Sequence, residues 1–109
     1  MKASVRLTVE KGKPWVTSPH YITPKDERVK SEKGEYAALG IDKDLREASR
    51  KALRGMVNWL VGEKGLSREE AYMLASVAAD LKIAEIVDMP HYAVACSLPL
   101  SVFVGVPYV

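Results

Sequence analysis

The first ten residues alternate between hydrophobic and polar side chains. In the stretch SVRLTVE, residues 4–10, the hydrophobic residues Val5, Leu7 and Val9 fall on one face of an extended chain. A period of two is typical of a strand with one buried face, so this segment predicts a half-buried β-strand. Aromatic and β-branched residues between prolines in WVTSPHYITP, residues 15–24, favour a short extended piece or an edge strand.

The remaining β-strands are predicted from three later segments. Residues 25–35 are almost all charged or small, which is typical of a solvated, mobile loop. The sequence YAALGI that follows, residues 36–41, predicts a short strand. Alternation returns in KIAEIVD, residues 82–88, and in HYAVACSLP, residues 91–99, and both predict strands near the end of the chain.

Between these segments the hydrophobic spacing becomes helical. From Asp42 onwards hydrophobic residues recur at intervals of three and four, which predicts an amphipathic helix over about 43–63. A capping box made by Ser67 and Glu70 marks the start of a second helix over about 67–81. Because only a short turn separates the two, they are expected to form an antiparallel hairpin.

Strands on both sides of a helical hairpin predict an α+β fold. We expect a single domain over residues 1–109, in which the hairpin packs against short β-strands from both ends of the chain. The second helix has little polar surface after its first turn, so it is expected to be the more buried of the two.

Composition limits the classes of partner. The 16 basic and 14 acidic side chains give a net charge of +2 without a basic cluster, so neither nucleic acid nor a membrane is expected as a partner. The only cysteine, Cys96, has no partner for an internal disulfide, which favours a reducing, cytoplasmic location. The chain has no glutamine, one asparagine and many lysines and glutamates, a bias that favours a thermophilic source.

Three residues are candidates for chemistry. His20 and His91 each lie between a proline and a tyrosine, and His20 is the better candidate because its segment is loop-like and polar. A surface histidine making one hydrogen bond is the simpler explanation of either. Asp80 is expected at the C-terminal end of the second helix, where the helix dipole disfavours an acid. It either pairs with Lys82 or a backbone N–H, or it orients a histidine, binds a cation or accepts a substrate N–H.

Several motifs resemble the closing portion of the acetamidase/formamidase family. They are GIDKDL at 40–45, GLSREEAYML at 65–74, ADLKIAEIVD at 79–88 and LPLSVF at 98–103. The resemblance implies hydrolysis of formamide, acetamide or similar short amides to a carboxylate and ammonia. It also implies a divalent metal such as zinc, held mainly by residues outside this chain, because family members carry a large N-terminal part that is absent here.

The resemblance identifies Asp80 and His20 as candidate catalytic residues that lie near each other and do not make a complete site. The chain is then the C-terminal part of an amide hydrolase, which acts with a separately encoded N-terminal companion or as a homo-oligomer. The alternative is a non-catalytic remnant that serves as an assembly or protein-interaction module.

Overall fold

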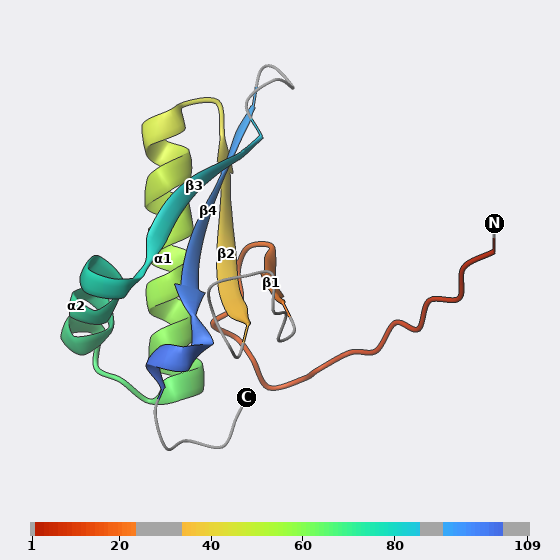
Figure 1. The fold of residues 1–109 in the computed structure, drawn as a ribbon, viewed down its shortest axis with the longest axis horizontal. Helices are drawn as coiled ribbons and strands as arrows, with labels where there is room; N and C mark the ends of the chain where they lie inside the picture. Colours follow the sequence, from red (N-terminus) through yellow and green to blue (C-terminus); the bar gives the residue numbers. More distant parts are fainter. Residues whose placement is uncertain (1, 24–33, 86–90, 104–109) are drawn as a thin grey trace.

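The computed structural model describes residues 2–23, 34–85 and 91–103 (Figure 1). It contains one four-stranded antiparallel sheet, two α-helices and a short 3-10 helix, and the α+β prediction is confirmed. Their bounds are β1 His20–Ile22, β2 Glu35–Asp42, α1 Leu45–Lys64, α2 Arg68–Ala78, β3 Asp80–Glu85, β4 Tyr92–Pro99 and η1 Leu100–Val102. The strand order is β1-β2-β4-β3, so β1 and β3 form the edges of the sheet.

Helix α1 packs closely on the centre of the sheet because both surfaces carry small residues. Ala48 and Ala52 are fully buried on the helix. On β2, a Cβ atom added to Gly40 would lie only 2.0 Å from the carbonyl oxygen of Ala48. Larger residues, including Met56 and Leu98, are fully buried in the same core.

The predicted helix boundaries are close to the observed ones. Asp44 caps α1 by accepting a hydrogen bond from the Arg46 N–H at 3.0 Å. Gly65 then ends α1 in the left-handed conformation, with φ of 71°. Both bonds of the capping box are present at the start of α2, at 3.0 and 3.1 Å between Ser67 and Glu70.

The prediction that the second helix is the more buried one is wrong. Only Ala71 and Ala75 of α2 are buried. The large residues Tyr72, Met73 and Val77 are 57%, 60% and 88% exposed. Small residues form the inner face of α2, and the hydrophobic residues that made the helix appear buried lie on its outer surface.

The predicted strand over residues 4–10 is not formed. Figure 1 shows this segment running away from the sheet, and Val5, Leu7 and Val9 are 80–90% exposed. A strand needs a neighbour for its backbone hydrogen bonds, and none lies beside this segment in the described residues. The sheet therefore begins at His20, inside the chain, and its strands do not come from both chain ends as predicted.

Two further predictions concern a loop and the membrane. The predicted loop 25–35 lies outside the described residues except for Gly34 and Glu35, and Glu35 is the first residue of β2. Within the described residues, no helix is both long and apolar enough to cross a membrane.

Candidate functional site

Strand β1 places His20 beside a buried tyrosine. The Nδ1 atom of His20 lies 3.0 Å from the hydroxyl of Tyr36 on the neighbouring strand β2. The ring of Tyr36 stacks on Trp59 of α1, with ring centroids 3.9 Å apart and an angle of 8° between the planes. Sheet and helix together therefore fix the phenol, and the phenol fixes one nitrogen of the histidine.

Burial determines what the Tyr36 hydroxyl can do. The residue is 2% exposed, and removal from water raises the pKa of the phenol well above its usual range. Tyr36 consequently remains protonated and can donate to Nδ1 of His20. The neutral imidazole then carries its proton on Nε2, whereas the opposite tautomer would donate from Nδ1 and leave Nε2 as an acceptor.

His20 also lines a cavity of about 170 Å³, and the segment before β1 lines one side of it. Trp15 and Trp59 supply aromatic walls, and Lys13 forms an ion pair with Glu63 at 3.2 Å across it. The buried indole N–H of Trp15 has no hydrogen-bond acceptor within the described residues. An unsatisfied buried donor costs about 1–3 kcal/mol, so this N–H is suited to a carbonyl oxygen.

A glycine on α1 explains the position of Trp15. A Cβ atom at Gly62 would lie 2.2 Å from the indole ring, so the ring packs directly on the helix backbone. Sequence reasoning missed both Trp15 and Tyr36 as site residues. Trp15 lies outside any periodic pattern, and Tyr36 contacts a histidine sixteen residues away in sequence. The available signal in the sequence was Gly62, a glycine inside the predicted helix, because its missing side chain leaves room for a large ring such as that of Trp15.

The structure places Asp80 elsewhere. Helix α2 ends at Ala78, so Asp80 is the first residue of β3 and not the end of the helix as predicted. It is exposed and pairs across the sheet with Ser97. The register aligns His20 with Leu81 through β2 and β4, and therefore Asp80 points to the opposite face from His20.

Asp80 and His20 are therefore not brought together. Three strand spacings separate them, a backbone distance of about 14 Å. His91, the second candidate histidine, is exposed immediately before β4. His20 and Asp80 lie on opposite edge strands, and His91 lies outside the sheet.

The described residues do not provide a ligand set for the implied metal. They contain no group of three His, Cys, Asp or Glu side chains that could hold a metal ion. Nδ1 of His20 is engaged by Tyr36, and burial raises the pKa of the Cys96 thiol to about 11, which keeps that sulfur protonated.

Comparison with solved structures finds a likeness to an acetamidase from Yersinia enterocolitica. The TM-score is 0.59 and the sequence identity is 31%, over 62% of this chain and 20% of that chain. This chain thus spans about a fifth of the length of that acetamidase. No curated protein matches the sequence. The sequence pattern of the acetamidase/formamidase family matches residues 14–104, and the chain belongs to that family.

Proposed function

We propose that this chain is one part of a short-chain amide hydrolase and that residues from outside its 109 positions complete the active site. The supporting observation is the family match over residues 14–104, combined with a likeness to only a fifth of an acetamidase chain. The remaining residues come from a companion polypeptide or from another copy of the chain.

The cavity beside His20 is the part of this chain that faces the substrate. The Trp15 N–H, which is closed to solvent in this structure, reaches the oxygen of a small amide after a rotation of the indole, and the aromatic walls limit the acyl group to a short one. Donors directed at an amide oxygen stabilise the negative charge that develops there during hydrolysis. Tyr36 engages Nδ1 of His20 and leaves the other ring nitrogen, Nε2, for the substrate. Nε2 orients the substrate nitrogen or a water molecule.

These groups do not hydrolyse an amide by themselves. Hydrolysis needs an activated water molecule and a proton donor to the leaving nitrogen, each within hydrogen-bond reach of the reacting atoms. Asp80 is on the other face of the sheet, and Glu63 is paired with Lys13. The activating group, metal-bound or not, is therefore supplied from outside the described residues.

The test is ammonia release from formamide and acetamide. The purified chain is assayed alone, over a range of concentrations, and with a candidate N-terminal companion. Activity in the mixture alone supports the proposed division between two polypeptides. Activity of the chain alone that rises steeply with its concentration supports a site shared between copies. Absence of turnover in every mixture contradicts the proposal.

Two matched variants test the role of the cavity. Trp15→Phe keeps an aromatic ring and removes the N–H, so kcat should fall by about 100-fold, the usual loss for one donor to the substrate oxygen. Tyr21→Phe is the control, because Tyr21 neighbours His20 on β1 but points to the other face of the sheet. Equal activities of the two variants would remove Trp15 from the site.

A second candidate function is a non-catalytic interaction module. It is favoured by the exposed hydrophobic residues on two separate parts of the molecule, Val5, Leu7 and Val9 near the N-terminus and Tyr72, Met73 and Val77 on α2. Surface of this kind is typical of protein-protein contacts. A stable complex with a companion that never turns over amides would favour this function.

A further inference from the structure

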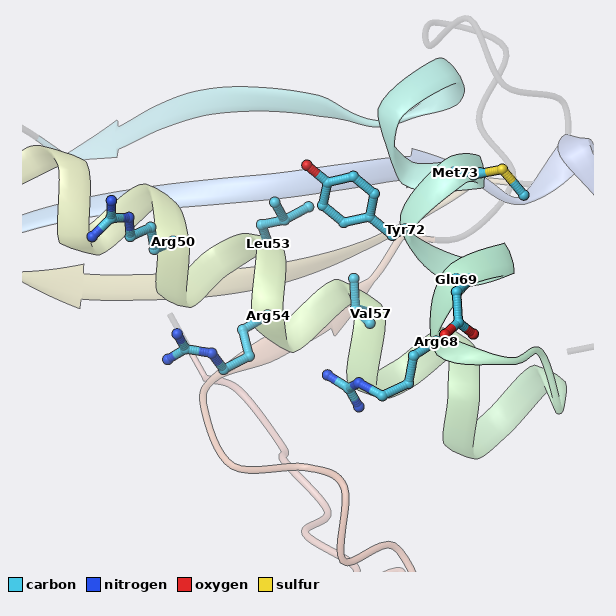
Figure 2. A pocket seen from close by; sticks show the side chains of 8 residues that line it. All are labelled: Arg50, Leu53, Arg54, Val57, Arg68, Glu69, Tyr72 and Met73. Carbon is cyan, nitrogen blue, oxygen red and sulfur yellow. The ribbon is translucent and has the colours of Figure 1, made fainter.

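An open groove runs between α1 and α2. Figure 2 shows it, with side chains from both helices along its sides. Its volume is about 720 Å³, which is several times that of the cavity beside His20. The lining residues are Arg50, Leu53, Arg54, Val57, Arg68, Glu69, Tyr72 and Met73.

The centre of the groove is hydrophobic. Leu53 and Val57 lie one helical turn apart on α1, and the ring of Tyr72 stands beside Leu53 in Figure 2. Tyr72 and Met73 expose more than half of their surface, although both lie on a well-defined helix. Large exposed hydrophobic side chains around a hollow are typical of a binding surface for another molecule.

The rim of the groove is positively charged. Three arginines and one glutamate line it, a formal charge of 3 − 1 = +2. Arg50 is partly neutralised by Glu47 at 2.6 Å, and Arg68 donates to the side chain of Asn58 at 3.2 Å. Arg54 is exposed and has no charged partner among the described residues, so its guanidinium is available to a carboxylate.

We propose that this groove binds an acidic amphipathic helix of a partner polypeptide, with hydrophobic residues in contact with Leu53, Val57 and Tyr72 and carboxylates paired with the arginines. A groove between two helices accepts a third helix along its length, and hydrophobic anchors at helical spacing fit its floor. The stretch from Arg50 to Val57 rises about 10 Å, the length of two turns of such a helix.

Charge selects this occupant over a second copy of the chain. The same face of a second copy would bring its own arginines against these, and like charges placed together disfavour association. An acidic helix satisfies both the hydrophobic floor and the basic rim. The proposal concerns a surface apart from the cavity beside His20, and it does not depend on amide hydrolysis.

The probe is a designed helical peptide of about four turns with leucines along one face and glutamates on both flanks. Its twin carries lysine in place of every glutamate. Binding is followed by NMR chemical shifts of the protein, which also locate the contact. We expect the acidic peptide to shift the resonances of Leu53, Tyr72 and Met73, with an affinity that falls as salt is added. The lysine twin should bind at least about tenfold more weakly.

Arg54→Glu should weaken the acidic peptide by about tenfold or more and strengthen its lysine twin. Lys11→Glu makes the same change of charge at an exposed position of the N-terminal segment, outside the groove, and should leave both affinities unchanged. Met73→Ala, also at an exposed position, should weaken both peptides by removing hydrophobic contact. Equal binding of both peptides, no binding at millimolar concentration, shifts elsewhere on the protein, or self-association through this face would each overturn the proposal.

Discussion

Replacement of Gly40 by alanine tests the close packing of α1 on β2. The added Cβ would lie 2.0 Å from the Ala48 carbonyl oxygen, 2.5 Å from the Ala52 nitrogen and 2.9 Å from the Lys51 Cβ. Ordinary contact begins at 3.4 Å, so the nearest atom must retreat by 3.4 − 2.0 = 1.4 Å. The two nearest of these are backbone atoms of α1, and the whole helix has to move away from β2 to relieve the overlap.

The loss of stability depends on the packing contacts that this movement of α1 would break. Inserting one methyl group into a packed core usually costs about 1–3 kcal/mol. Here the backbone of a 20-residue helix must yield, and a gap of 0.5–1 Å already removes a quarter to a half of each dispersion contact along the interface. Alanine returns about 0.5–1 kcal/mol by restricting the unfolded chain. Because the helix backbone has to move, the cost lies at the upper end of the range for an inserted methyl group, and we expect a net loss of about 2 kcal/mol in the free energy of unfolding.

Urea unfolding followed by circular dichroism measures this loss. The control is Gly55→Ala, in the middle of α1, where the nearest atom is a side-chain methyl at 3.0 Å and helix propensity gains about 1 kcal/mol. It should remain within about 1 kcal/mol of wild type. A Gly40→Ala protein as stable as the control, with an unchanged slope against urea, would refute the close packing of α1 on β2.

Two further predictions concern the start of α2 and the buried thiol. Ser67→Ala removes the N-terminal cap of α2 and should lower the free energy of unfolding by about 1 kcal/mol, as measured by urea unfolding. The control Ser76→Ala loses only a hydrogen bond to a carbonyl within the helix and should lower it by less. The raised pKa of Cys96, about 11 against 9.0 when unfolded, means that its stabilising contribution is complete below pH 9 and is lost as pH rises toward 11. Unfolding free energy should fall by up to about 1.4 kcal/mol per pH unit in that window, and the fall should be smaller in Cys96→Ala, as urea titrations at pH 8.5 and 10.5 would show.

Local signals in the sequence predicted the helices well. The capping box lies within four residues, and its two hydrogen bonds form wherever the helix starts, so Ser67 and Glu70 marked α2 reliably. The alternation of residues 92–98 likewise predicted β4, whose central residues are buried. These features depend on residues that are close together in the sequence, so one sequence is enough to predict them.

Burial and pairing were harder to predict because they depend on what lies alongside. The alternation of Val5, Leu7 and Val9 shows that one face could be buried, but the described fold offers it no neighbouring strand. The hydrophobic residues of α2 likewise predicted burial, and the groove leaves Tyr72 and Met73 open. A pattern shows which face is hydrophobic, and only the surrounding structure or a partner covers it.

The separation of Asp80 from His20 limits the catalytic roles that the two residues can share. Side chains alternate strictly along a strand, so only a one-residue shift of β3 would turn Asp80 to the side of His20. That shift would move Leu81 from the helix side, where it lies in register with Cys96, to the opposite face. Even then three strand spacings would remain. If both residues act in hydrolysis, they act on opposite faces of the sheet or in different copies of the chain. Asp80→Asn should then leave the Trp15 cavity and its affinity for acetamide unchanged.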